Sequence, residues 1–375
     1  MGKSILLLSE DLDYHGIAVR WGLEQLGVSA DWWVRSSFPV ESAISIGVGK
    51  NGDDYEVIDG NRVAFTEDAY GAIWNRRGKT PTVSARLTRT DRVVAKAESS
   101  FLLTGMVSVL EQRNASGLIV NKAAAGERIN SKVPQLVTAR KVGFTVPATL
   151  ISNEPGRIRE FCEELQGSVV VKQHIPFVWR LKDGRLALPG TRAIRSDDLK
   201  DDEPLSAAPM IYQQYIPIEH EIRVTVFCAN VFAILRTRSG VNKWGFCDIK
   251  YEDSTSRAIE LPPRLRNKCL EFMRQAGLVF AAFDIAISTD GGEYFLECNE
   301  AGQFLFLEEI VPEIPLLDAF CRFLASGDSS YKYGRRKGEI SLAEFDESEA
   351  GRSMQERLMA SSRASKVFSP FELSE

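Results

Sequence analysis

The first part of the chain alternates short apolar runs with an amphipathic stretch. Ser4–Ser9 contains four consecutive aliphatic residues and Ala30–Val34 is apolar and aromatic, so both are predicted to be buried strands. Between them, Tyr14–Leu26 has apolar positions at helical spacing and is followed by Gly27, a common helix terminator. Ala72–Trp74 then begins another strand. This order of elements predicts an α/β unit.

Helical and extended patterns keep alternating further along the chain. The predicted helices are Asp91–Arg113, Lys132–Val142, Pro155–Glu164 and Arg264–Gln275. The predicted strands are Leu118–Asn121, Ser168–Lys172, Met210–Ile216 and a pair within Glu221–Arg236 that turns at Ala229-Asn230. Asp59-Gly60 and Asp183-Gly184 each predict a small hairpin, because Asp-Gly suits both central positions of the favoured turn. Ser196–Pro209, rich in charge and proline, predicts an exposed connector.

The last part of the chain changes from apolar to polar. Glu308–Leu324 predicts a closing helix that Pro312 and Pro315 interrupt. Tyr331–Glu375 is charged and predicts a tail with one amphipathic helix near Leu342–Met359 and little core of its own. The whole pattern predicts a mixed α/β and α+β protein.

The stretch Ala282–Gln303 places three oxygen-bearing side chains on one predicted hairpin. With a turn at Asp290-Gly291, Asp284 lies directly opposite Glu297, and Asn299 follows on the same face. The opposite face is predicted to be core and carries Phe283, Ile285, Ile287, Tyr294, Leu296 and Cys298. Two carboxylates and an amide suit Mg²⁺, which takes a few protein oxygens together with phosphate and water. From the residues alone, a solvated strand face with two acids and an amide stays equally open.

Composition narrows the class of protein. The 375 residues are 44% hydrophobic, enough for two or three domains with substantial cores. A formal net charge of −5 argues against nucleic acid as a partner, and no uninterrupted apolar run is long enough to predict a membrane span. The six cysteines include no Cys-x-x-Cys pair and mostly lie among apolar residues. They predict reduced thiols in a cytoplasmic protein.

The order of these features resembles that of the ATP-grasp carboxylate–amine ligases. Phe295–Gln303 (F-L-E-C-N-E-A-G-Q) is similar to the E-x-N metal strand of that superfamily. Its trailing Gly302-Gln303 and Trp74–Arg77 (W-N-R-R) look most like the graspetide, or microviridin-type, maturases of ribosomally made peptides. The resemblance spans about residues 1–326. It implies an N-terminal pre-ATP-grasp domain (1–115), two nucleotide-clamping subdomains (116–208 and 209–326) and a polar tail (327–375).

The resemblance also implies roles for individual residues. Lys132 and Lys172 would neutralise the triphosphate, although Lys132 can equally be read as a solvated first-turn residue. Glu221 would bind the ribose, or be a surface acid. The adenine slot would be formed by Gln213, Gln214, Tyr215 and Ile216, which also fit an ordinary core strand. Arg223, and after it Arg236 or Arg238, would stabilise the transferring phosphoryl group, with one of the three arginines expected to be structural.

Two segments depart from the family pattern, and a third, rich in glycine, is not interpreted as a phosphate loop. The second lysine is followed by Gln173–Arg180, which contains no glycine, where many ATP-grasp enzymes have a glycine-rich flap. His174 or Arg180 is the candidate replacement, and contact of this segment with the peptide is the alternative. Asp248-Ile249-Lys250 stands where the maturases tend to have D-W-R, and a lysine loses bidentate recognition of a carboxylate. Gly47, Gly49 and Gly52 predict a flexible turn rather than a phosphate loop.

The function implied by the resemblance is an ADP-forming ligase that uses ATP and Mg²⁺. A substrate carboxylate would become an acyl phosphate, and a hydroxyl or amine would displace phosphate to give an ester or amide crosslink within a precursor peptide that has a leader segment. The family favours a homodimer. Arg76 and Arg77 are candidates for contacting an acidic peptide or for structural ion pairs. The alternatives are a ligase that adds an amino acid or amine to a carboxylate, and a nucleotide-binding regulatory module without turnover.

Overall fold

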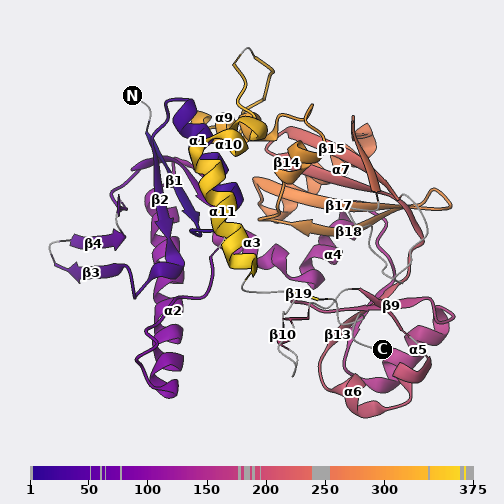
Figure 1. Cartoon of the computed structure of the whole chain (residues 1–375). Coiled ribbons are helices and arrows are strands. Elements are labelled where there is room, and N and C mark those ends of the chain that lie inside the picture. The colour runs from indigo at the N-terminus through magenta and orange to yellow at the C-terminus, as the bar shows by residue number, and fades with distance from the viewer. Residues whose placement is uncertain are drawn as a thin grey trace.

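The computed structural model describes residues 3–50, 52–59, 61–63, 65–76, 78–175, 179–180, 186–187, 191–194, 196–238, 254–336, 338–363 and 367–368. An N-terminal α/β unit, a small central sheet and a larger antiparallel sheet make up most of it, and the C-terminal helices lie beside the first and the last (Figure 1). The predicted mixed α/β and α+β class is confirmed. The four domain boundaries stay a prediction.

A four-stranded parallel sheet forms the centre of the N-terminal unit. Its order is β2-β1-β6-β7, with β1 at Ser4–Ser9, β2 at Ala30–Val34, β6 at Tyr70–Asn75 and β7 at Leu118–Val120. Helix α1 (Tyr14–Gln25) connects β1 to β2, and α2 (Arg89–Arg113) lies between β6 and β7 in the chain. The buried residues in the middle of these strands are apolar, and helices cover both faces of the sheet. Their carboxyl ends meet along one edge.

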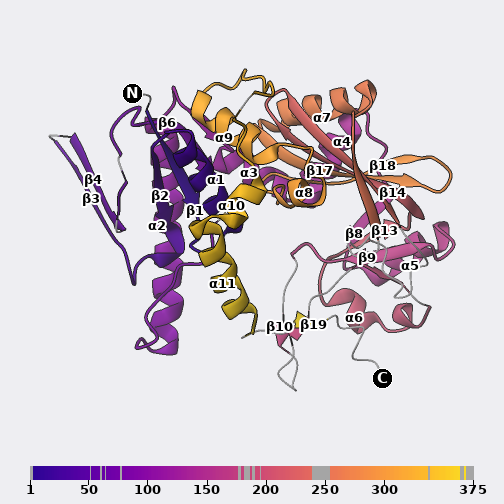
Figure 2. The same cartoon turned by 45° about the horizontal axis from the view of Figure 1, so that its top comes forward.

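Helix α2 continues beyond this sheet in both views (Figure 2). Its second half packs on the sheet through Leu103, Met106, Val107 and Leu110. Its first half leaves Val93, Val94 and Phe101 exposed, at 66%, 55% and 84% of their surface. By length and composition α2 passes the test for a membrane span, with a mean hydropathy of 1.4 in a window that is 28% buried. A helix packed on a core passes the same test, so this is weak evidence for a span.

A surface hairpin extends from the N-terminal unit. Strand β3 (Ala43–Gly49) pairs with β4 (Gly52–Asp59), which pairs in turn with the short β5 (Asn61–Arg62), as Asp59-Gly60 predicted. The glycines that predicted a flexible turn lie mostly in strands, and Gly49 pairs directly with Gly52. The turn is therefore shorter than predicted. An added Cβ at Gly49 or Gly52 would have no neighbour within 4 Å, but Gly52 has φ +115°, a conformation that favours glycine.

The central sheet has the order β12-β9-β13-β8 and is antiparallel. Its strands are β8 (Thr149–Ser152), β9 (Val169–Lys172), β12 (Arg192–Ala193) and β13 (Met210–Gln214). Helices α5 (Pro155–Glu164) and α6 (Asp202–Ser206) pack against it. Ser196–Pro209 is mostly exposed, as predicted, but it contains a 3₁₀ turn (Ser196–Leu199) and α6, and Leu205 is buried. The sequence analysis missed the burial of Leu205 because most residues around it are charged or polar.

The predicted hairpin at Asp183-Gly184 is confirmed in its strands. β10 (Trp179–Arg180) pairs antiparallel with β11 (Leu186–Ala187), while the turn lies outside the described residues. β11 also pairs in parallel with β19 (Val367–Phe368).

The large antiparallel sheet has the order β16-β15-β14-β17-β18. Its strands are β14 (Ile218–Phe227), β15 (Asn230–Arg238), β16 (Ser254–Ile259), β17 (Phe280–Ser288) and β18 (Glu293–Asn299). Helix α7 (Pro263–Ala276) covers one face and ends at Gly277 with φ +70°, as predicted.

A β-bulge alters the core face of the predicted metal hairpin. Asp284 lies opposite Glu297, but the next residue, Ile285, lies opposite Phe295. Phe295 is therefore fully buried, whereas Tyr294 and Leu296, predicted as core, are half-buried. One extra residue in β18 changes which face each side chain takes.

The C-terminal helices join the two outer units. They are α8 (Phe306–Ile310), α9 (Leu316–Ser326), α10 (Leu342–Glu347) and α11 (Glu349–Arg363), so the predicted interruption of the closing helix is confirmed. Phe320 of α9 contacts four aromatic rings from separate elements: Trp74, Phe227, Phe280 and Phe304, at centroid distances of 4.9 to 5.7 Å. Leu342 and Phe345 of the polar tail join the same core. This shared core sets the N-terminal unit against the large sheet.

Five cysteines are free thiols, in agreement with the prediction: Cys162, Cys228, Cys269, Cys298 and Cys321. Cys247 lies outside the described residues.

Candidate active site

Charged side chains from three adjacent strands form one row across the large sheet. The register places Arg223 of β14 opposite Asp284 of β17, and Asp284 opposite Glu297 of β18. Arg223 forms an ion pair with Asp284 and donates a hydrogen bond to the Gln303 carbonyl at 3.0 Å. Directly opposed residues share a face, so the three side chains converge. The hairpin pattern predicted the pairing of Asp284 with Glu297.

Lys132 and Asn299 complete this cluster from either side of Glu297. Lys132 begins α4 (Lys132–Lys141) and its Nζ lies 2.6 Å from Glu297 Oε2. Asn299 donates through Nδ2 to Glu297 Oε1 at 2.7 Å. The trio Asp284, Glu297 and Asn299 is therefore assembled, with Lys132 as a fourth member.

The two carboxylates differ in their affinity for a proton. Burial raises the pKa of Asp284, the Arg223 guanidinium opposes the rise, and the Glu297 carboxylate adds to it. Burial acts in the same direction at Glu297, but the Lys132 ammonium and hydrogen bonds from Lys132 and Asn299 outweigh it and lower the pKa. Asp284 therefore keeps a proton to higher pH than Glu297, whose carboxylate Lys132 and Asn299 stabilise.

These residues fit the donor set of a magnesium site. Among the residues that the structure describes, no group of three or more His, Cys, Asp or Glu side chains is placed to hold a metal. The cluster instead offers two carboxylates and an amide oxygen, all oxygen donors. Mg²⁺ takes few protein oxygens when phosphate and water complete its shell.

A second ion pair lies on the same face of the sheet. Arg236 of β15 is opposite Glu221 of β14, and its Nη1 lies 2.7 Å from Glu221 Oε2. Both side chains are nearly buried, at 4% and 12% exposure. Glu221 is two residues before Arg223, so the pair lies roughly 7 Å along the strand from the row. Arg236 is thus the arginine whose described contacts look structural.

The two predicted nucleotide elements lie in the central sheet. Lys172 is the last residue of β9 and is half-buried, in register with Ile211 of β13. Gln213 is buried and donates to Thr149 Oγ1 at 3.0 Å. The backbone amides of Gln214 and Tyr215 already donate to Ala148 and Ser168, at 2.8 and 2.9 Å. Those two amides are engaged within the chain. Ile216 is buried and Tyr215 is 38% exposed.

Two amide side chains that the sequence analysis missed hold β17 and β18 in place. Asn121, directly after β7, bonds through Nδ2 to the Phe280 and Glu300 carbonyls and through Oδ1 to the Val279 and Phe280 amides, at 2.7 to 2.9 Å. Gln135 of α4 bonds to both backbone groups of Cys298, at 2.8 and 3.0 Å. A polar residue at the carboxyl end of a parallel strand was a usable signal for Asn121.

The segment after β18, residues 300–305, is fastened by the N-terminal unit. Arg76 donates to the Ala301 and Gly302 carbonyls, and its Nε lies 3.3 Å from Asp13 Oδ2. His15 Nε2 accepts from the Phe304 and Leu305 amides, at 2.9 and 3.1 Å. Because Arg76 is 2% exposed and engaged here, its candidacy for peptide contact is wrong and its structural alternative holds.

Several predicted positions cannot be placed. Arg77 and Asp248-Ile249-Lys250 lie outside the described residues, as do residues 176–178 of the flap. The side chains of Arg180 and Arg238 are also outside them. His174 is exposed.

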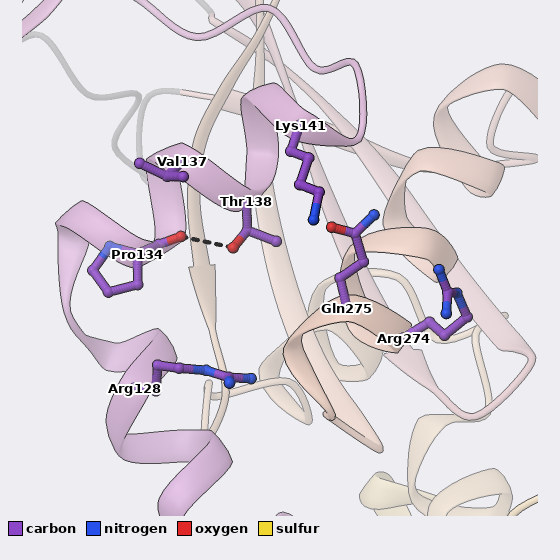
Figure 3. Close-up of a pocket in the computed structure, with 7 residues that line it drawn as sticks. All are labelled: Arg128, Pro134, Val137, Thr138, Lys141, Arg274 and Gln275. Atoms are coloured by element: carbon purple, nitrogen blue, oxygen red, sulfur yellow. Dashed lines mark hydrogen bonds between the residues drawn. The ribbon is translucent and has the colours of Figure 1, made fainter.

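A surface pocket of about 710 Å³ lies beside α4 (Figure 3). It is lined by Arg128, Pro134, Val137, Thr138, Lys141, Arg274 and Gln275. Lys141 and Gln275 point toward one another across it, and Arg274 is paired with Glu271. No predicted site residue is among these lining residues, so the pocket is distinct from the row on the sheet.

Comparison with known proteins shows which solved structures this chain resembles. No protein-family model and no curated protein sequence matches the chain. Among solved structures, the macrocyclase MdnC bound with precursor peptide MdnA, from Microcystis aeruginosa MRC, is 24% identical over 86% of this chain and 99% of its own, with a TM-score of 0.75.

Two further structures agree with it. A RiPP-associated ATP-grasp ligase of Chryseobacterium gregarium, in complex with ADP and a leader and core peptide, is 21% identical, covers 91% of this chain and 100% of its own, and has a TM-score of 0.75. The ATP-grasp ligase PsnB, complexed with minimal precursor, Mg and ADP, is 22% identical over 86% of this chain and 97% of its own, with a TM-score of 0.66. The chain therefore has the ATP-grasp fold, in the form found in ligases that act on ribosomally made precursor peptides.

Proposed function

We propose that this chain is an ATP- and Mg²⁺-dependent ligase of the graspetide type, which crosslinks side chains within a ribosomally made precursor peptide. The observation that carries the proposal is the row of Arg223, Asp284 and Glu297, with Lys132 and Asn299, on a fold shared with precursor-peptide ligases. Five charged or amide groups concentrated on a half-buried face suit a polyanionic substrate and its counter-ion.

The proposed reaction has two steps. An oxygen of an Asp or Glu side chain of the peptide attacks the γ-phosphorus of ATP, the bond to the β-phosphate oxygen breaks, and ADP leaves. A Ser or Thr hydroxyl, or a Lys amine, of the same peptide then attacks the acyl carbon. Phosphate departs, the nucleophile loses its proton, and an ester or amide remains. Catalysis of this kind is mostly positioning and neutralisation of charge.

Each residue of the cluster has a proposed part. Lys132 and Lys172 neutralise phosphate oxygens from the two sides of the clamp, and Arg223 stabilises charge on the transferring group. Glu221 binds the ribose, held in position by Arg236, while Tyr215 and Ile216 line the adenine slot with Gln213 and Gln214 behind them. Asp284, Glu297 and Asn299 would hold Mg²⁺, which supplies charge neutralisation at the phosphates. PsnB, which shares the fold, was solved with Mg and ADP.

The partners follow from the same proposal. The substrate is a peptide with a leader segment that docks away from the chemistry. The Chryseobacterium ligase, which shares the fold, was solved in complex with a leader and core peptide. We place the protein in the cytoplasm, in keeping with its free thiols. A ligase that adds a separate amine would give a product heavier by one residue, whereas crosslinking removes water from one peptide.

The exposed half of α2 supports a homodimer. Val93, Val94 and Phe101 are its most exposed large apolar residues, and exposed Ala97 lies midway between them. Two copies of α2 crossing antiparallel at Ala97 would set Phe101 of each against Val93 and Val94 of the other, with the backbones close at the small residue. Lys96 would then face the second copy's Glu98, reciprocally. Apolar contact and charge complementarity both favour a second copy as the occupant.

The proposal is tested by Glu297→Gln. This variant removes the charge that pairs with Lys132 but keeps an oxygen acceptor for Asn299, so we expect it to fold and to lose at least about 100-fold in ADP formation. Glu293→Gln is the matched control, because Glu293 lies on the same strand and pairs with Arg264 away from the row.

The assay uses peptides encoded by short reading frames beside this gene that contain repeated Thr or Ser and Asp or Glu. Loss of water from the peptide, detected by mass spectrometry, accompanies ADP release in the wild-type protein. Undiminished ADP formation by the Glu297 variant would remove the metal assignment. Nucleotide binding without ADP formation on any peptide would favour the non-catalytic module.

A further inference from the structure

The carboxyl ends of the parallel strands form an edge that the proposed chemistry does not yet use. The strands β1 and β6 are neighbours, but α1 leads from β1 to β2 on one side and α2 leads from β6 to β7 on the other. Open parallel sheets bind ligands where connections diverge in this way. Arg76 and Asn121, which follow β6 and β7, fasten the segment after the proposed metal strand, so this edge adjoins the active site.

Arg35 follows β2 at the same edge and lies near the Glu10 carboxylate, but no hydrogen bond of its side chain is found among the residues that the structure describes. Its Nε is buried and makes no hydrogen bond, and no ion pair of its guanidinium is found among the residues that the structure describes. Burial lowers its pKa, although the Glu10 carboxylate acts in the opposite direction. A half-buried guanidinium whose Nε has no hydrogen-bond acceptor is unfavourable, and a bound ligand that supplies the acceptor would remove this cost.

Gly78 provides the surface on which this guanidinium lies. A Cβ at position 78 would approach Arg35 Nη2 to 2.8 Å, Cζ to 3.0 Å and Nε to 3.3 Å. Any side chain there would displace the arginine. Gly78, Lys79 and Thr80 are exposed, so a ligand can reach this surface from solvent.

Glu10 positions the site and is otherwise engaged. It is 3% exposed and accepts from the Ser36 hydroxyl and, at 2.8 Å, from the Lys79 amide. These bonds tie the loop after β2 to the loop after β6, with Arg35 beside both. The segment after β6 also contacts the segment after β2 directly, because the Thr82 amide donates to the Ser36 carbonyl at 2.9 Å.

We propose that the Arg35 guanidinium, lying over Gly78, binds a carboxylate side chain of the peptide substrate, next to the one that is activated. This inference rests on the proposed function for the identity of the peptide. The planar fork of arginine matches a carboxylate through two parallel hydrogen bonds, and the exposed Lys79 adds positive charge near the entrance. The site selects acidic neighbours and directs the peptide toward the row on the large sheet.

The test measures binding of acetyl-Glu-Glu-Glu-amide and of its Gln counterpart to the full-length protein, by calorimetry at constant ionic strength. We expect the wild-type protein to prefer the Glu peptide, and Arg35→Met to weaken its binding roughly 10- to 100-fold. Gly78→Ala keeps the charge of Arg35 but moves its guanidinium, so this variant should also weaken binding of the Glu peptide. Arg92→Met, at an exposed arginine of α2, is the control and should change nothing.

Stability and nucleotide binding separate this inference from the proposed function. Arg35→Met should leave thermal stability unchanged or raised, and should keep the stabilisation by Mg-ADP. A wild-type protein that Mg-ADP does not stabilise would contradict the proposed function and leave the peptide result standing. Equal binding of the Glu peptide by the wild-type and Arg35 variants would overturn the inference, as would a large loss of stability in Arg35→Met. Binding of inorganic phosphate in preference to the Glu peptide would overturn the carboxylate assignment.

Discussion

At the scale of single residues, the two buried arginines of the large sheet have different surroundings. Arg223 contacts both Asp284 and the Gln303 carbonyl, and Arg236 forms an ion pair with Glu221. Arginine can serve two acceptors at once through its planar fork, and lysine cannot do so with the same geometry. The two residues therefore respond differently to the same conservative substitution.

We expect Arg223→Lys to lower kcat roughly 10- to 100-fold, because one ammonium cannot hold Asp284 and Gln303 together. Arg236→Lys keeps a cation beside Glu221, so it should leave kcat nearly unchanged and raise KM for ATP by less than about tenfold. Steady-state ADP release with varied ATP separates the two parameters. Equal losses of kcat would return Arg236 to the catalytic role predicted from the sequence.

At the scale of elements, the metal hairpin depends on amides outside it. Asn121 makes four hydrogen bonds to backbone groups of β17 and its surroundings, and Gln135 ties α4, which carries Lys132, to Cys298 of β18. Both side chains are almost fully buried, at 3% and 1% exposure. Strand position, and with it the location of Glu297, is therefore set partly by neighbouring elements.

Gln135→Leu should lower the free energy of unfolding by about 2–4 kcal/mol, because it leaves buried backbone groups of Cys298 and Ile129 without partners. It should also lower kcat, since Lys132 begins the same helix. Gln275→Leu is the matched control, because its bond to Glu271 lies at the surface, and its effect should stay within about 0.5 kcal/mol. Denaturant unfolding measures both. An equal effect of the two substitutions would contradict the anchoring role.

The start of the two C-terminal helices depends on one carboxyl group. Glu308 accepts from the Leu317 amide of α9 and the Leu342 amide of α10, each at 2.7 Å. Burial raises its pKa to about 7, although these two hydrogen bonds oppose the rise. The folded state therefore holds a proton that the unfolded state releases near pH 4.5.

The pKa of Glu308 is higher in the folded than in the unfolded state. Its contribution to the free energy of unfolding is therefore fully present below pH 4.5 and is lost as the pH rises through 7. The loss amounts to at most about 3 kcal/mol. Denaturant unfolding at pH 5 and pH 8 should show this decrease in the wild-type protein and a smaller one in Glu308→Gln, which cannot ionise. An identical pH dependence of the two proteins would show that Glu308 is not responsible.

At the scale of the whole molecule, the exposed half of α2 is the feature that a single copy leaves unexplained. We expect Phe101→Asp to convert a dimer to a monomer in light-scattering measurements, because it places a charge in the apolar contact. Val133→Asp changes an apolar residue of similar exposure, 51%, on α4 and should leave the mass unchanged. A monomeric wild-type protein would contradict the dimer.

Disulfide trapping checks the register of the same contact. Ala97→Cys should crosslink to itself on oxidation, because the proposed two-fold axis passes there. Ser108→Cys lies 11 residues further along the exposed side of α2. Its two copies would be roughly 33 Å apart and should stay uncrosslinked. If Phe101→Asp weakens peptide binding without changing the mass, the patch serves the peptide instead.

Much of the fold could be predicted from local pattern. The strands β1, β2, β6 and β9 and the helices α4, α5 and α7 follow from apolar periodicity and from glycine or proline at their ends, which act over a few residues. The failures were also local in origin. The bulge in β18 places Phe295 in the core, and the charged sequence around α6 did not predict a helix. The alternation of apolar and polar residues along a strand does not indicate where one extra residue is inserted.

The candidate site, too, could be predicted from the sequence only in part. The convergence of Asp284, Glu297 and Asn299 follows from the chain alone, because a tight Asp-Gly turn and strand pleating place residues at set intervals on one face. Tertiary packing decided the pairing of Arg236, the hydrogen bonds of Arg76 and His15 to residues 300–305, and the position of Arg35 over Gly78. These contacts join residues far apart in the chain, and the cores around Phe320 and α7 determine which of them meet.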